Sequence, residues 1–388
     1  MYRMGQEERD AVARVIESGQ LFKVNKGPLQ EVQNFEKELK EKLGAEYTIL
    51  MTSGQGALVS ALVGMGIGPG DEVIVPAYTY IATAMAVVAA GAVPVIAEID
   101  ETLMLDPGDV EKKITPRTKA VIPVHMRGYP CDMDGIIKVA KEHGLQVLED
   151  ACQADGGTYK GKYLGTIGDA GALSFNYFKI ISAGEGGALL TDNKEIFERA
   201  LIYHDSSAVA FFGNQMEDFS AEPFCGTELR TNEITAAILR EQLKKLDGIL
   251  ADLRRNKKKL MELLAPHFRF IPMNDAEGGC ATTLTLQFDT AEEAERVAER
   301  SPIKASVPIN TGKHVYTAWT PILEKKGAAH PLMNPFNLPA NSFASFDKDC
   351  CKKSLEILKK AVHLNIDPDW TEKEIADIAD QLIAVLTK

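Results

Sequence analysis

The chain has 388 residues, and because a single hydrophobic core rarely grows past roughly 250–300 residues, two domains are expected. Its 45% hydrophobic and 25% charged residues are ordinary for a folded globular protein and exclude a largely disordered or low-complexity chain. The 43 Lys and Arg against 55 Asp and Glu give a formal net charge of −12, which disfavours general binding to nucleic acid or to an anionic membrane.

The cysteines and the apolar runs bear on the compartment. The six cysteines include no CxxC pair, and the N-terminus lacks the basic and apolar regions of a signal peptide, so a reducing cytoplasm is expected. The longest apolar stretch, 82–97, is interrupted by Gly91 and Pro94 and is shorter than the ~20 residues that a membrane helix needs. No transmembrane segment is therefore expected.

The N-terminal part of the chain predicts two helices followed by a phosphate-type turn. Apolar spacing predicts amphipathic helices over 6–18 and 29–43, joined by a polar loop that would ordinarily be a plain connector. A strand over 47–51 then leads through a glycine turn into a helix, TSGQGALVSAL. The first N–H groups of such a helix are unpaired and its dipole is positive there, so the turn predicts an anion site. A glycine turn without a ligand is the alternative.

One of the strands that follow ends in a carboxylate. Apolar runs predict further strands and a helix over 73–75, 93–100, 119–125 and 131–144. The strand over 146–149 delivers Asp150 at its C-terminal end, where open α/β sheets place ligand-binding groups. A buried carboxylate needs a partner, so the position predicts a ligand contact. A surface aspartate that caps a helix is the alternative.

The stretch from Gly171 to Asp192 predicts two short strands, AGALSF and GGALLT, on either side of Lys179. A lysine on a short loop between buried strands is partly removed from water. Partial desolvation favours the neutral amine that a Schiff base with an aldehyde cofactor requires. The alternative is a β-hairpin whose lysine points into water.

The C-terminal part predicts a loop at a subunit contact, a connecting helix and a second domain. The stretch 203–225 follows a helix over 194–202, and its weak periodicity and aromatic residues favour a loop that orders across a subunit contact. Leucines at three- and four-residue spacing over 239–253 predict a long helix that joins two domains. A smaller α+β domain without metal-ligand spacing then comprises the strand ATTLTLQF, the segment KASVPINTG and helices over 290–300, 351–361 and 371–386.

Several motifs occur in the order found in one enzyme family. SGQGAL, PAYTY, PVHMRG, EDACQ, SFNYFK with GEGG, and GTELRTNEITAAILREQL together resemble the DegT/DnrJ/EryC1/StrS family of pyridoxal-phosphate (PLP) sugar aminotransferases. Seven short apolar strands alternating with helices, the phosphate turn and the lysine point to a three-layer αβα, fold type I domain of the aspartate-aminotransferase type, with a smaller C-terminal α+β domain. The expected division is a large PLP-binding domain over 1–245 and a small domain over 246–388.

The resemblance implies the cofactor contacts. Lys179 would hold PLP as a Schiff base, and Asp150 would pair with the protonated ring nitrogen, which keeps the ring able to draw electrons. Tyr80 would stack on the ring, although a core tyrosine is the competing interpretation, and Gln153 would lie beside the ring hydroxyl. The remaining expected cofactor contacts are Gly54, Gln55, Gly56, Ala57 and Ser174.

The sequence departs from the family pattern at three positions. Gln55 stands where threonine is usual, so one side-chain contact to the phosphate is in doubt. Glu228 replaces the asparagine that in the family reaches the cofactor phosphate of the neighbouring subunit, and it is not counted among the phosphate ligands. Arg127 follows PVH where an aromatic residue is more common. An arginine in such a pocket either pairs with an internal carboxylate or receives one from a ligand.

The resemblance also implies substrates and assembly. Arg127, Lys23, His314 and Tyr316 are expected substrate contacts, with core packing the alternative for the last two. The expected reaction moves an amino group from glutamate or glutamine to a keto- or aldehyde-sugar, with an acidic octulosonic-type acceptor favoured by Arg127. Such enzymes serve cell-surface polysaccharide, including lipopolysaccharide, or secondary-metabolite biosynthesis. A homodimer with shared active sites is expected from the resemblance over 203–240.

Two other functions compete with amino transfer. A PLP-dependent sugar dehydratase of this kind has histidine in place of the Schiff-base lysine, so Lys179 argues against it. A non-catalytic PLP-binding regulator would not need Lys179, Asp150, Gln153, Tyr80 and Ser174 together.

Overall fold

Seven of the apolar runs form one mostly parallel sheet. In the computed structural model, which describes residues 2–209 and 219–386, the strand order is β1-β9-β8-β5-β4-β2-β3. The strands are β1 (Tyr47–Met51), β2 (Glu72–Pro76), β3 (Val93–Ala97), β4 (Thr118–Val121), β5 (Gln146–Asp150), β8 (Ala170–Ser174) and β9 (Gly187–Thr191). β9 pairs antiparallel with both of its neighbours, whereas the strands from β8 to β3 pair in parallel. Their almost continuous burial is typical of a sheet that is covered on both faces.

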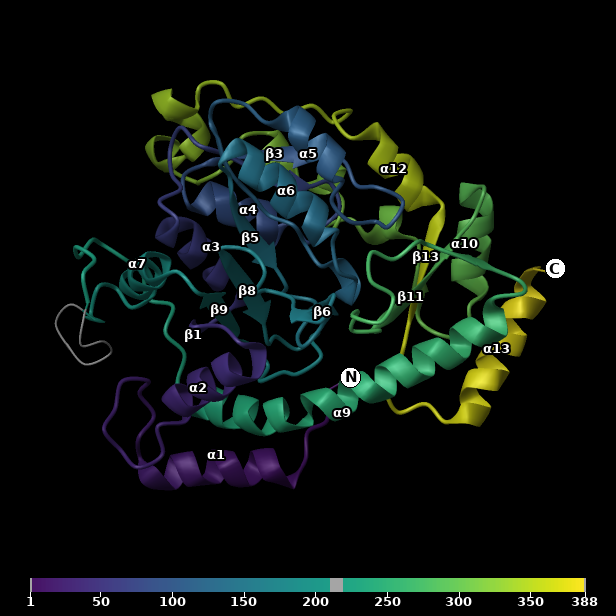
Figure 1. Cartoon of the computed structure of the whole chain (residues 1–388), viewed down its shortest axis with the longest axis horizontal. Helices are drawn as coiled ribbons and strands as arrows, with labels where there is room; N and C mark the ends of the chain where they lie inside the picture. Colours follow the sequence, from purple (N-terminus) through teal and green to yellow (C-terminus); the bar gives the residue numbers. More distant parts are fainter. Residues whose placement is uncertain (1, 210–218, 387–388) are drawn as a thin grey trace.

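Helices on the two faces of this sheet complete a three-layer αβα domain (Figure 1). Four of them, α3, α5, α6 and α7, begin where a polar side chain accepts a helix N–H, as Asp132 and Asn193 do for α6 and α7. Several end at a left-handed glycine such as Gly44 or Gly144. The helices are α1 (Gln6–Ser18), α2 (Glu31–Leu43), α3 (Gly54–Gly64), α4 (Ala82–Ala89), α5 (Pro107–Lys113), α6 (Met133–His143) and α7 (Lys194–His204). A small hairpin, β6 (Thr158–Tyr159) and β7 (Lys162–Tyr163), follows β5.

A second, antiparallel sheet has the order β10-β11-β13-β12. Its elements and neighbours are β10 (Arg269–Phe270), β11 (Thr283–Gln287), α10 (Ala291–Arg300), β12 (Ala305–Ser306), α12 (Lys352–Lys359), β13 (Ala361–Asn365) and α13 (Glu372–Leu386). Short helical turns at η2 (Pro308–Thr311), η3 (Tyr316–Ala318), α11 (Thr320–Leu323), η4 (Pro331–Met333), η5 (Pro335–Asn337) and η6 (Pro339–Asn341) fill the connection. The expected C-terminal bound of the helix over 351–361 is wrong. The helix ends at Lys359, and the chain then forms β13, which pairs with both β11 and β12.

A single helix connects the two sheets. α9 (Glu233–Leu264) runs without interruption from beneath α2 to α13, as Figure 1 shows, and it also contacts β11. The proposed division between 245 and 246 therefore falls inside one continuous helix. Among residues 2–209 and 219–386, no helix combines the length and apolar character needed to cross a membrane. The part of the expected subunit-contact loop from 210 to 218 lies outside the described residues.

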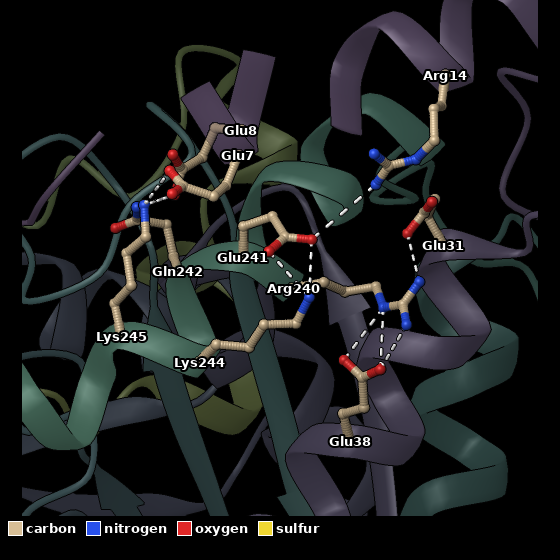
Figure 2. A network of polar contacts seen from close by, with 10 residues as sticks. All are labelled: Glu7, Glu8, Arg14, Glu31, Glu38, Arg240, Glu241, Gln242, Lys244 and Lys245. Atoms are coloured by element: carbon tan, nitrogen blue, oxygen red, sulfur yellow. Dashed lines mark hydrogen bonds and ion pairs between the residues drawn. The ribbon is translucent and has the colours of Figure 1, made fainter. Parts of the chain in front are cut away.

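A network of charged side chains holds the two N-terminal helices on α9 (Figure 2). Arg240 of α9 contacts Glu31 and, with two nitrogens, Glu38, both from α2. Lys245 of α9 contacts Glu8 of α1. Glu31 is only 3% exposed, so its carboxylate depends on Arg240 for compensation of its charge.

We expect Arg240→Met to lower the free energy of unfolding by about 2–3 kcal/mol, because it leaves the buried Glu31 carboxylate without its cation. Lys244→Met is the matched control on the same helix, since its partner Glu241 forms an exposed pair worth less than about 1 kcal/mol. Thermal unfolding of the two variants measures the difference. Equal shifts in Tm would contradict the importance of the buried pair.

Candidate active site

The ends of the parallel strands bring the expected site residues to one edge of the large sheet. Parallel strands share a direction, so their C-terminal ends meet at the same edge. β5 ends at Asp150, β8 ends at Ser174, and β2 is followed within four residues by Tyr80. Arg127 lies in the turn η1 (Met126–Gly128) after β4. This edge is therefore the candidate active site.

Lys179 lies on a loop that both of its neighbouring strands hold. The loop leaves β8 and returns to β9, the two strands that the sequence predicts on either side of Lys179, and these strands pair antiparallel. Phe175 N–H donates to the Gly186 carbonyl at 2.9 Å, and Tyr177 N–H donates to the Gly184 carbonyl at 2.9 Å. Lys179 N–H donates to the Asn176 carbonyl at 3.0 Å. The loop is thus a hydrogen-bonded unit, and it carries the half-buried lysine into a cleft.

The first turn of α3 packs directly against this loop. The Ser53 hydroxyl accepts from Gly56 N–H at 3.0 Å and caps the helix. A Cβ added to Gly54 would lie 2.7 Å from Cys152 Sγ and 2.8 Å from Ser174 Cβ, so only glycine fits. The helix N-terminus that the sequence predicts as an anion site is therefore held beside Ser174 and the residues that follow Asp150.

Asp150 is a buried carboxylate held by two donors. Thr83 donates its hydroxyl proton to Asp150 Oδ2 at 2.7 Å, and Cys152 N–H donates to Oδ1 at 3.2 Å. Thr79 lies one helical turn before Thr83 and is 2.8 Å from it, hydroxyl to hydroxyl. Burial raises the pKa of the Cys152 thiol, Asp150 adds to this rise and Lys179 opposes it, so the thiol lies near both groups.

A cleft of about 680 Å³ brings together Tyr80, Gln153, Lys179, Arg127 and His314. The ring centroids of Tyr80 and His314 are 5.7 Å apart. Gln153 Oε1 accepts from Arg127 N–H at 3.2 Å. The cleft thus gathers five of the residues that the sequence singles out, although four different segments of the large domain and one of the small domain supply them.

The cleft is positively charged. Its lining includes Arg127, Lys179, Lys304 and Lys313, and no Asp or Glu is among the described residues that line it. Within residues 2–209 and 219–386, no ion pair joins any of these four cations to a carboxylate. An internal carboxylate partner was one of the two expectations for Arg127. The described part of the chain does not provide one.

Two of the expected substrate contacts do not reach the cleft. Lys23 is 3% exposed, and its ammonium is 2.9 Å from Glu36 Oε1 and 3.2 Å from His204 Nε2. Burial chiefly, and the charge of Lys23, lower the pKa of His204, so its neutral ring accepts this contact. Tyr316 is fully buried and donates its hydroxyl proton to the Lys348 carbonyl at 2.5 Å. Both residues are structural, because their polar ends are already engaged.

Glu228 is also engaged within the chain. Its carboxylate forms an ion pair with the Arg230 guanidinium and accepts from Arg230 N–H at 2.9 Å. This agrees with leaving Glu228 out of the phosphate contacts.

Sequence reasoning missed Thr83, Lys304 and Lys313. The four-residue spacing from Thr79 to Thr83 at the start of a helix was the available signal for the first, and no local pattern singles out the two lysines.

Comparisons with known proteins show the family to which the chain belongs. The profile of the DegT/DnrJ/EryC1/StrS aminotransferase family matches residues 2–383. The chain is 41% identical over 274 residues to the spore coat polysaccharide biosynthesis protein SpsC of Bacillus subtilis (strain 168), which covers 69% of this chain and 68% of that protein. It is 38% identical over 323 residues to a GDP-perosamine synthase of Escherichia coli O157:H7, covering 81% and 85%. The crystal structure of 3-amino-5-hydroxybenzoic acid synthase superposes with a TM-score of 0.81 at 28% identity, covering 100% and 98%.

The fold and the site define a PLP-dependent aminotransferase of fold type I. The chain belongs to the DegT/DnrJ/EryC1/StrS aminotransferase family, and by family it is a PLP-dependent sugar aminotransferase. The residues present fit this cofactor. A helix N-terminus beside Ser174 suits a phosphate, the buried Asp150 carboxylate suits a protonated ring nitrogen, and Lys179 in the cleft suits an aldehyde.

His314 gives the site a measurable pH dependence of stability. Burial chiefly, with the charges of Arg127 and Lys313, lowers the pKa of His314 to about 4. The unfolded chain therefore binds this proton near pH 6.5 while the folded chain does not, and stability is lost as the pH falls from 6.5 towards 4. We expect His314→Gln to lose less free energy of unfolding between pH 7 and pH 5 than the wild type. Parallel denaturant titrations measure this, and identical losses would contradict it.

Proposed function

We propose that the protein transfers an amino group from glutamate or glutamine to a keto- or aldehyde-sugar, with Lys179 as the residue that holds PLP. The observation that carries this proposal is the position of Lys179. It lies in the cleft with Tyr80 and Gln153, on the loop between β8 and β9, and the ends of these two strands contact the start of α3. In this position the same lysine can both bind the cofactor covalently and transfer the proton.

Each neighbouring residue has a chemical task in this proposal. Bound PLP supplies an electron sink for the carbon that loses a proton. Lys179 Nζ would take that proton and move it between the two carbons that the amino nitrogen joins, the carbon of the amino donor and the aldehyde carbon of the cofactor. Asp150, held by Thr83, would pair with the protonated ring nitrogen. The first N–H groups of α3, at Gly54 and Gln55, would hold the phosphate, and Tyr80 would stack on the ring.

We further propose that the acceptor is an acidic sugar of the octulosonic type. Besides Lys179, which holds PLP in this proposal, the cleft carries the cations Arg127, Lys304 and Lys313, and its described lining has no carboxylate. A ligand carboxylate would offset part of this positive charge. The planar guanidinium of Arg127 suits a carboxylate bound through two oxygens. The names of the relatives, spore coat polysaccharide biosynthesis and GDP-perosamine synthesis, support a role in cell-surface polysaccharide. All six cysteines are unpaired thiols, which supports a reducing cytoplasm as the compartment.

The two competing functions have less support. A sugar dehydratase of this kind has histidine where this chain has Lys179. A PLP-binding regulator would need the phosphate site, but it would need neither a lysine in an open cleft nor the cations that face it.

The active form in this proposal is a homodimer with shared sites. Tyr177 and Phe178, which directly precede Lys179, are 64% and 75% exposed in the single chain, and a two-fold partner would cover such aromatic side chains. Light scattering at assay concentration is expected to give a dimer. An active monomer would contradict shared sites.

Lys179 is expected to be the attachment point. Borohydride reduction of the protein loaded with PLP, followed by peptide mapping, should place the label on the peptide that contains Lys179. Lys304 and Lys313 line the same cleft and serve as internal controls for accessibility. Label on either of them, or on no lysine, would refute the assignment. Mass spectrometry of the protein incubated with PLP, glutamate and a panel of keto-sugars would then identify the acceptor.

Arg127→Met should affect only the acceptor half of the reaction. We expect the KM for an acidic sugar to rise by about ten- to a hundredfold, the equivalent of ~1.5–3 kcal/mol for a hydrogen bond to a charged group. Lys304→Met removes an exposed cation from the same cleft and should have a smaller effect. A loss confined to the glutamate half would assign Arg127 to the donor. Unchanged rates in both halves would make it a structural residue.

A further inference from the structure

A buried chain of three side chains links the two sheets directly behind the cleft. Tyr78 follows β2 and is 1% exposed. Its hydroxyl is 2.8 Å from Nε2 of His363, a buried residue of β13. His363 Nδ1 is 2.8 Å from the hydroxyl of Thr285 in β11. Sequence reasoning assigns no role to these residues, and amino transfer as described above does not use them.

The direction of these hydrogen bonds follows from the neighbouring Arg127. Burial raises the pKa of Tyr78, and the Arg127 guanidinium beside the hydroxyl opposes this rise. Burial and the same guanidinium lower the pKa of His363, so its ring is neutral. The positive charge of the guanidinium repels a hydroxyl proton, so the Tyr78 proton points away from Arg127 and goes to His363 Nε2. The ring then carries its proton on Nδ1 and donates to Thr285.

The backbone of Arg127 is fixed as well. Its N–H donates to Gln153 Oε1 at 3.2 Å, and its carbonyl accepts from the Thr282 hydroxyl at 2.8 Å. Its φ of 58° is left-handed, and a Cβ on the next residue, Gly128, would lie 2.7 Å from Cys280 Cβ. Both sheets therefore determine where the Arg127 side chain starts, and Tyr78 meets it at the far end.

We propose that Tyr78, supported by His363 and Thr285, is a positioning residue that holds the Arg127 guanidinium in the orientation that receives the acidic group of the acceptor. The inference rests on the function proposed above and adds to it the residues that set acceptor recognition. A flexible arginine loses conformational entropy when it binds a carboxylate. If Tyr78 already restricts the rotamers of Arg127 in the free protein, less entropy is lost when the ligand binds. The domain interface thereby takes part in substrate selection.

Glucuronate and glucose form a matched pair of probes, since they differ by the carboxylate that Arg127 would bind. Calorimetry on the protein loaded with PLP should show that the wild type binds glucuronate more tightly. Tyr78→Phe keeps the ring and removes the oxygen, and it should reduce this preference about three- to tenfold. Thr285→Val removes the hydroxyl at the far end of the three hydrogen-bonded side chains and should also reduce the preference for glucuronate. This variant provides a second test if Tyr78→Phe folds poorly.

Tyr129→Phe is the matched control. Tyr129 is also buried between the two sheets, but its hydroxyl donates to the Thr283 carbonyl at 2.8 Å and accepts from Thr285 N–H at 3.1 Å. Tyr129→Phe should lower Tm as Tyr78→Phe does, but it should leave the preference for glucuronate unchanged. An equal loss of preference in both variants would mean that loosening the interface explains the effect, and it would overturn the proposal.

The double variant decides whether Tyr78 acts through Arg127. In an Arg127→Met background, Tyr78→Phe should reduce the preference no further, because the group that it positions is gone. An additive loss, an unchanged preference in Tyr78→Phe alone, or a wild type that binds both sugars equally would overturn the inference. A coupled loss of preference in a protein that aminates no sugar would support the positioning role and refute the proposed reaction instead.

Discussion

The close contact between the start of α3 and the ends of β8 and β9 fixes the geometry of the site. A Cβ at Gly187 would lie 2.2 Å from the Ser53 carbonyl carbon, so the anion-binding end of the helix and the loop that carries Lys179 are in backbone contact. In the proposed function these two elements hold one cofactor, and they must then keep a constant separation. The glycines provide this separation by removing every side chain between them, and the hydrogen bonds of the loop with Gly184 and Gly186 maintain it.

Charge distribution separates the cleft from the rest of the surface. The whole chain has a formal charge of −12, whereas the described lining of the cleft has four cations and no carboxylate. Acidic residues instead accumulate at the helix contacts, where Glu31, Glu38 and Glu8 meet cations of α9 (Figure 2). These carboxylates are paired with cations of α9, whereas the cations that line the cleft have no ion pair within the described residues, so their charge remains available for anionic ligands.

Local patterns predict those parts of the structure that depend on local contacts. The strands of the large sheet are predictable because continuous apolar runs between glycine and proline turns have few alternatives. β13 is not, because AVHLN follows a helix without a turn signal and looks like its continuation until β11 and β12 pair with it. Lys23 looks like an exposed loop residue, yet its partners Glu36 and His204 are 13 and 181 positions away. Motif spacing finds Lys179 and Asp150, whereas long-range contacts decide which other residues reach the cleft.

The left-handed backbone of Arg127 has a consequence for redesign of the enzyme. At a φ of 58°, β-branched side chains are strongly disfavoured, whereas asparagine, aspartate and glycine are tolerated. Few amino acids at this position are therefore compatible with the backbone conformation, whatever ligand the variant is meant to bind. Asparagine combines tolerance of this conformation with a neutral hydrogen-bonding group, which makes it the natural starting point for an enzyme variant directed at uncharged sugars.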